Sequence, residues 1–178
     1  MNLPNKLSLT RIALIPLMVA LMYPNTTVCN LLAAAVFALA AFTDFLDGHI
    51  ARKQQIVTDF GKFVDPVADK LLVLSALIML IQQGLMLAWV VVVILARELC
   101  VDGLRMVAGS KGMVIAAGKL GKIKTTVQIV LILWLMLSRQ PVMGSIISGA
   151  LTLLVLVMTL WSGVEYFRNN RSVISTMK

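Results

Sequence analysis

Long stretches without charge constrain the fold of this chain more than any other feature. With their flanking residues, most of these stretches approach the roughly 20 residues that an α-helix needs to cross a bilayer. Backbone polar groups in lipid must be satisfied within the segment, so we expect helices rather than open strands. The pattern predicts one domain, residues 1–178, that is an all-α integral membrane protein with six transmembrane helices. The almost charge-free blocks are residues 12–23, 28–42, 71–81, 85–96, 127–137 and 142–163.

Composition and charge distribution support this fold class. The chain is 60% hydrophobic and 13% charged, whereas soluble domains are about 45–50% apolar and about 25% charged. The net charge of +8 could suit a nucleic-acid partner, but its distribution argues for a membrane. If six helices are threaded from a cytoplasmic N-terminus, all Lys and Arg residues except Arg139 fall on the cytoplasmic side. This positive-inside pattern predicts a multi-pass cytoplasmic-membrane protein with both termini inside and no nucleic-acid partner.

Two pairs of aspartates lie at the ends of successive spans. Asp44 and Asp47 are three residues apart, and Asp65 and Asp69 are four apart. Pairs with these spacings share one face of a helix. One span leads into the connection and the next leads back, so we expect the two pairs to face each other on the cytoplasmic side. Pro66 is expected just inside the start of the third span, where helices accept proline.

The chemistry of these carboxylates predicts a metal site. An unpaired acid costs a transmembrane helix about 2.5–3.5 kcal/mol at mid-membrane, and less near the interface. Four acids close together would also repel one another. Hard cations remove both penalties, and oxygen-only ligands suit Mg²⁺, Mn²⁺ or Ca²⁺ rather than zinc. Two carboxylate pairs suit two ions about 3.5–4 Å apart, a common arrangement for displacement at phosphorus. We therefore predict two divalent cations, Mg²⁺ or Mn²⁺.

The residues around the aspartates suit a diphosphate or a nucleotide. Gly48 and Gly61 have no side chain, so a ligand can approach the backbone closely. Arg52 offers a planar fork for phosphate, and Thr58 offers a hydroxyl. A single Asp–x2–Asp pair is most often a solvated helix end. Two pairs combined with two glycines and an arginine indicate a binding site.

Residues 44–69 carry the pattern D-x2-D-G-x2-A-R-x8-G-x3-D-x3-D, and in this the chain resembles the CDP-alcohol phosphatidyltransferases. The resemblance implies the fold of that family, a homodimer of six-helix protomers, and transfer of a phosphatidyl group from a CDP-linked lipid. It also implies residue roles. The implied metal ligands are Asp44, Asp47, Asp65 and Asp69. Asp69 is also the implied general base. The implied CDP-lipid contacts are Asn5, Gly48, Arg52 and Thr58, beside Gly61.

Motifs in the second half of the chain indicate which alcohol accepts the phosphatidyl group. Residues 95–106 (LARELCVDGLRM) and 118–128 (GKLGKIKTTVQ), with the opening NLPNKLSLTR, resemble the branch that makes phosphatidylglycerophosphate. The implied substrates are CDP-diacylglycerol and sn-glycerol 3-phosphate, and the implied location is a bacterial inner membrane. An anionic acceptor needs a cluster of bases, and Glu98 is expected to orient one of them. The candidate acceptor-phosphate residues are Arg97, Arg105, Lys122, Lys124 and Arg11.

Other interpretations of these residues stay open. The bases could instead be positive-inside anchors that contact anionic headgroups of membrane lipids. The chain could also be a sister phosphatidyltransferase that uses inositol phosphate or another small alcohol, and inositol phosphate would also need a basic pocket. A non-enzymatic alternative is a cation-binding membrane carrier or scaffold. Release of CMP separates the enzymes from the carrier, and the lipid product separates the two enzymes.

Overall fold

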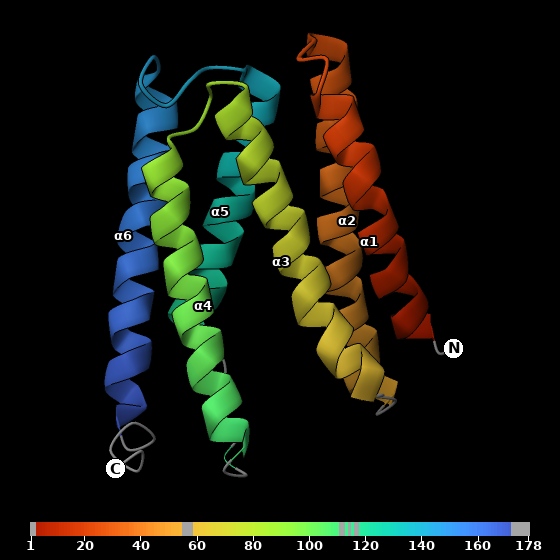
Figure 1. Ribbon diagram of the computed structural model, residues 1–178, viewed down its shortest axis with the longest axis vertical. Coiled ribbons are helices and arrows are strands. Elements are labelled where there is room, and N and C mark those ends of the chain that lie inside the picture. Colours follow the sequence, from red (N-terminus) through yellow and green to blue (C-terminus); the bar gives the residue numbers. More distant parts are fainter. Residues whose placement is uncertain (1–2, 55–58, 111–112, 114, 116–117, 172–178) are drawn as a thin grey trace. The chain divides into compact units, whose positions relative to one another are not determined.

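The described part of the chain is entirely helical. The computed structural model describes residues 3–54, 59–110, 113, 115 and 118–171, and the side chains of residues 3–8, 44–54, 59–66 and 119 lie outside the description. Within these limits the structure contains six α-helices and no strand (Figure 1), which confirms the all-α prediction. The helices are α1 (Leu3–Met22), α2 (Thr27–Gln54), α3 (Asp59–Gln82), α4 (Ala88–Ser110), α5 (Lys119–Ser138) and α6 (Ile146–Asn169).

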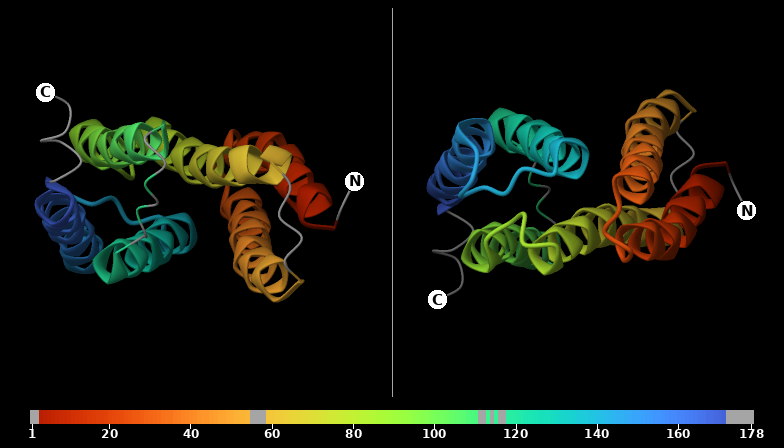
Figure 2. Two further views of the ribbon diagram at one scale, coloured as in Figure 1. Left: turned by 90° about the horizontal axis from the view of Figure 1, so that it is seen from below. Right: turned by 90° about the horizontal axis from the view of Figure 1, so that it is seen from above.

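The helices form two compact units. Unit 1 comprises Met1–Met86 and Ile132–Pro141, and unit 2 comprises Leu87–Leu131 and Val142–Lys178. In unit 1, α1 packs along both α2 and α3, and α2 also contacts α3. In unit 2, α4 packs against α6. Figure 2 shows the three helices of unit 1 and the α4–α6 pair from their ends.

One polar network joins three helix ends in unit 1. The Gln83 side-chain Nε2 donates a hydrogen bond to the Met22 carbonyl oxygen at 2.7 Å and to Asn30 Oδ1 at 3.0 Å. Asn30 is fully buried. Gly84 ends α3 in the left-handed region, with φ +73°, where a glycine has no steric penalty. The end of α1, the start of α2 and the end of α3 therefore lie together.

Arg139 joins the same region of unit 1 to the end of α5. Its Nη2 atom donates to the Asn25 carbonyl oxygen at 2.7 Å and to Asn25 Oδ1 at 2.9 Å. Its Nη1 atom donates to Thr27 Oγ1 at 3.0 Å. Arg139 is the one basic residue that the threading leaves off the cytoplasmic side. In the structure its side chain joins the end of α5 to the turn between α1 and α2.

Much of the helix surface is apolar. Among the described residues, two helical segments are long and apolar enough to cross a bilayer, Leu120–Ser138 and Ile146–Asn169, and Leu9–Met22 and Thr27–Thr43 are shorter apolar segments. Soluble monomers rarely expose large apolar patches, so this surface is typical of helices that face lipid. Exposed apolar side chains include Leu17, Leu39, Ile78, Val92, Leu153, Leu160 and Trp161.

The connection between α2 and α3 is shorter than the hydropathy pattern indicates. α2 continues to Gln54, and α3 begins at Asp59. Pro66 therefore lies inside α3, and the prediction that it marks the start of the helix was wrong. The apolar block sets only where a helix would enter lipid, whereas the helix itself continues through the polar residues beyond it.

Replacing Gln83 with leucine tests the polar network. The change removes two donors and leaves buried Asn30 without this partner, and an unsatisfied buried polar group costs about 1–3 kcal/mol. At roughly 2–4 °C per kcal/mol for a chain of this size, we expect the Tm of the purified protein in detergent to fall by several degrees. Gln82→Leu is the matched control, because Gln82 is exposed. Equal Tm values for the two variants would contradict a role for the network.

Candidate active site

The backbone of unit 1 brings the four aspartate positions to one end of the α2–α3 pair. Asp44 lies fourteen residues after Asn30, and Asp69 lies fourteen residues before Gln83. At a rise of about 1.5 Å per residue, both positions are about 21 Å along their helices from the Asn30–Gln83 hydrogen bond. The two helices are antiparallel, so α2 after Asn30 and α3 before Gln83 both extend from that bond toward the same end of the pair, and Asp44 is level with Asp69.

The remaining aspartate of each pair, Asp47 on α2 and Asp65 on α3, lies at a similar distance from the Asn30–Gln83 bond. Asp47 lies seventeen residues after Asn30, and Asp65 lies eighteen residues before Gln83. These separations correspond to about 25–27 Å along α2 and α3. The two pairs thus occupy the same one-turn layer of unit 1, at the end opposite the polar network. Two neighbouring helices can bring carboxylates together in such a layer.

Asp69 has a basic partner on α1. Arg11 Nη1 forms a hydrogen-bonded ion pair with Asp69 Oδ1. The Arg11 side chain is only 1% exposed, whereas that of Asp69 is 41% exposed. A buried guanidinium in an apolar bundle needs such a partner. Arg11, which the sequence suggests as an acceptor-phosphate residue, contacts the aspartate layer in this structure, so α1 contributes to it.

The donor set suits hard divalent cations. The four aspartate positions offer oxygen ligands in one layer, as Mg²⁺ and Mn²⁺ require. Arg11 supplies a positive charge to Asp69. Gly48 and Arg52 lie on α2, Gly61 on α3 and Asn5 on α1. Thr58 lies outside the described residues.

Unit 2 contains a separate cluster of charges. Lys124 on α5 is fully buried, and its Nζ atom donates to Glu98 Oε1 on α4 at 2.5 Å. Glu98 remains 16% exposed. The sequence predicts that Glu98 orients a base, and Lys124 is the base that it contacts. The pair fixes the Lys124 ammonium group inside the helix packing, with its charge balanced by Glu98.

Arg97 passes between two glycines in this cluster. A Cβ atom at Gly163 on α6 would lie 3.3 Å from Arg97 Cγ, and one at Gly121 on α5 would lie 3.5 Å from Arg97 Nη2. The missing side chains therefore leave room for the arginine between α5 and α6. Within the described part of the chain, the buried Nε of Arg97 has no hydrogen-bond partner. An anion could provide an acceptor for this donor.

The remaining predicted bases divide into two groups. Arg105 Nε donates to the Tyr166 hydroxyl at 3.1 Å, and its guanidinium lies over the tyrosine ring, 5.5 Å from the centroid. It lies two turns from Arg97 on α4. Lys122, in contrast, is exposed, and about 200° of helix rotation separates it from Lys124. The structure brings Arg97 together with the Lys124–Glu98 pair and leaves Lys122 on another face of α5.

Sequence analysis missed Gln128. This residue is one helical turn beyond Lys124 on α5 and is only 2% exposed. Among the described residues, neither its Nε2 nor its Oε1 has a hydrogen-bond partner. Burying an amide without hydrogen bonds costs several kcal/mol on transfer scales, on the order of 2–7. Its position four residues after Lys124 in an apolar run is the signal that could have identified it.

Comparisons with known proteins show the family of the chain. The model of the CDP-alcohol phosphatidyltransferase family matches residues 1–161. A Bacillus subtilis (strain 168) protein named CDP-diacylglycerol–glycerol-3-phosphate 3-phosphatidyltransferase is 46% identical over 98% of each chain. Proteins with the same name from Rickettsia typhi and Shigella flexneri are 37% and 38% identical over 94% and 96% of this chain, and each match covers 96% of the relative. The chain therefore belongs to the CDP-alcohol phosphatidyltransferase family.

Proposed function

We propose that this protein transfers the phosphatidyl group of CDP-diacylglycerol to sn-glycerol 3-phosphate, giving phosphatidylglycerophosphate and CMP for anionic phospholipid synthesis. The observation that carries the proposal is the common layer of Asp44, Asp47, Asp65 and Asp69, which the Asn30–Gln83 bond sets. The printed name shared by its relatives supports the same donor and acceptor.

Two divalent cations, Mg²⁺ or Mn²⁺, would be held by the four aspartates. When bound, they would neutralise the diphosphate of the donor and stabilise the charge that develops at phosphorus. Arg52 and Thr58 would bind the donor phosphates, with Asn5, while Gly48 and Gly61 would allow close approach to the backbone.

Asp69 acts as the general base in this proposal. It takes the proton of the acceptor hydroxyl, whose oxygen bonds to the phosphorus next to the lipid. The bond from that phosphorus to the bridging oxygen of CMP breaks, and CMP leaves with the electron pair. The contribution of Asp69 is mainly position, and its ion pair with Arg11 restricts the orientation of the carboxylate.

The acceptor phosphate would bind to the charge cluster of unit 2. Arg97 offers a planar fork whose Nε donor has no hydrogen-bond partner among the described residues, and such a fork suits a phosphate group. Buried Lys124 adds a second positive charge, and Glu98 fixes its position. Arg105 is held two turns along α4 by Tyr166 and could complete the cluster. Gln128 could supply hydrogen bonds for the glycerol hydroxyls, which a phosphate-only site would not require.

The protein would act as a multi-pass component of a bacterial cytoplasmic membrane. Six spans would put both termini and the aspartate layer on the cytoplasmic side, and the distribution of Lys and Arg supports this orientation. The apolar side chains on the outer helix faces support contact with lipid. We also expect a homodimer, as the family resemblance implies.

An acceptor assay tests this function. Purified protein with Mn²⁺ or Mg²⁺, CDP-diacylglycerol and labelled glycerol 3-phosphate should form phosphatidylglycerophosphate and CMP in equal amounts, and inositol phosphate should give no lipid product. Asp69→Asn should reduce turnover by at least about 100-fold, because general-base catalysis contributes roughly 10²–10⁴-fold. Product from inositol phosphate would identify the sister activity, and failure to release CMP with any acceptor would favour a carrier or scaffold.

Replacing Arg97 with lysine tests the acceptor pocket. Lysine keeps the charge but loses the planar fork, and hydrogen bonds to charged groups contribute about 1.5–3 kcal/mol. We expect the KM for glycerol 3-phosphate to rise by roughly tenfold or more, with little change in the KM for CDP-diacylglycerol. Lys122→Gln, on another face of α5, should leave both values unchanged. Equal increases in both KM values for Arg97→Lys would exclude a specific acceptor role.

A further inference from the structure

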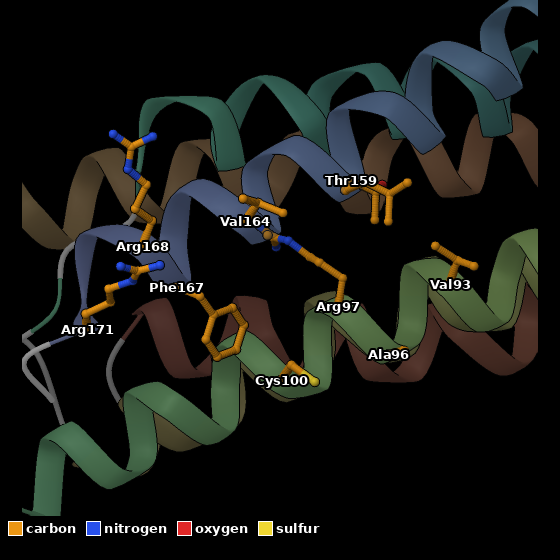
Figure 3. A pocket seen from close by; sticks show the side chains of 11 residues that line it. Val93, Ala96, Arg97, Cys100, Thr159, Val164, Phe167, Arg168 and Arg171 are labelled. Atoms are coloured by element: carbon orange, nitrogen blue, oxygen red, sulfur yellow. The ribbon is translucent and has the colours of Figure 1, made fainter. Parts of the chain in front are cut away.

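A groove in unit 2 lies between α4 and α6. It includes Arg97, which the proposed reaction uses, and extends to residues of α6 that the reaction does not use. Its volume is about 620 Å³, within the roughly 300–1,000 Å³ typical of ligand sites. Figure 3 shows that α4 and α6 both contribute its walls. The lining residues are Val93, Ala96, Arg97, Cys100, Thr159, Leu160, Gly163, Val164, Phe167, Arg168 and Arg171.

The walls of the groove are apolar along most of its length. Val93 and Ala96 form part of the α4 side, and Leu160 and Val164 form part of the α6 side. Leu160 and Val164 are 58% and 69% exposed. These two side chains would gain from contact with another apolar group. An extended hydrocarbon chain is an occupant that fits this surface.

One end of the groove is strongly basic. In Figure 3, Arg168 and Arg171 both lie at one end of the pocket and Val93 lies at the other. Both arginines are exposed, and neither forms an ion pair with any residue that the structure describes. Within the described part of the chain, the two guanidinium groups therefore present positive charge without a paired acid next to an apolar wall.

The combination indicates an amphipathic anion. We propose that the α4–α6 groove is an accessory site for an anionic glycerophospholipid, with one acyl chain along the apolar walls and the headgroup phosphate on Arg168 and Arg171. A small soluble phosphate would leave the apolar walls exposed to water. A zwitterionic headgroup would bring its own cation close to the arginines, and the repulsion between like charges would disfavour its binding.

The position of the arginines fits a lipid in the inner leaflet. They lie in and just after the last turn of α6, where the proposed topology reaches the cytoplasmic surface. Basic side chains at this depth attract anionic headgroups and can extend their charged ends to the interface. Beside the arginines, the groove also offers apolar walls for an acyl chain. Basic residues that act only as a membrane anchor would not need such walls.

Cys100 provides a reporter inside the groove. Cys29 and Cys100 are the only cysteines of the chain, so Cys29→Ser leaves one site for a small bimane fluorophore. The labelled full chain is placed in nanodiscs that contain either phosphatidylglycerol or phosphatidylcholine with brominated acyl chains, which quench bimane on contact. Half-maximal quenching is expected at about a fivefold lower mole fraction of the anionic lipid.

Two variants show whether this preference comes from the groove. Arg168→Gln combined with Arg171→Gln should equalise quenching by the two lipids. A matched reporter at Leu153→Cys, in a background without the native cysteines, should show no preference, because Leu153 lies outside the groove on α6 and is 62% exposed. The readout requires no turnover, so it is independent of the proposed transferase reaction.

Several results would overturn the proposal. Equal quenching by both lipids in the chain with both arginines would show that the groove does not select anionic lipid. Absence of quenching by either lipid would mean that another protein surface, such as a second copy of the chain, covers the groove. Loss of the preference on adding glycerol 3-phosphate or inorganic phosphate would mean that the arginines bind a soluble anion. If the preference for anionic lipid persists in the double glutamine variant, residues other than Arg168 and Arg171 cause it.

Discussion

Charge buried in an apolar helix bundle needs a partner, and this requirement organises both units of the protein. In unit 1 the buried guanidinium of Arg11 meets Asp69, and in unit 2 the buried ammonium of Lys124 meets Glu98. Removing one member of such a pair leaves an uncompensated charge, which is strongly destabilising. Each pair also joins two different helices, so the groups that are proposed to act in chemistry have fixed neighbours in the packing.

Hydrogen bonds far from the proposed chemistry set the register of the aspartates. Gln83 and Asn30 hold the start of α2 against the end of α3, and equal lengths of helix then bring Asp44 level with Asp69. A rise of about 1.5 Å per residue makes this geometry sensitive to a single insertion or deletion in either helix. The aspartate layer thus depends on a polar contact about 21 Å away along the helices.

The sequence predicted the helical fold and the placement of both aspartate pairs on successive helices, because hydropathy and i,i+3 or i,i+4 spacing are local properties. It did not predict the partner of Arg11, since an ion pair between α1 and α3 depends on packing. The sequence grouped Lys122 with Lys124, yet only Lys124 is buried against Glu98. It also placed Pro66 just inside a helix start, because the polar residues before the apolar block at 71–81 gave no sign that the helix begins as early as Asp59.

The central claim is that the four aspartates form one site for two divalent cations, and electron paramagnetic resonance of Mn²⁺ tests it most directly. The purified protein should bind two Mn²⁺ ions per chain with a spin-coupled spectrum, because ions in such sites lie about 3.5–4 Å apart. Asp44→Asn should weaken binding and remove the coupling. One ion per chain, or two ions with the spectrum of isolated Mn²⁺, would contradict the common aspartate site.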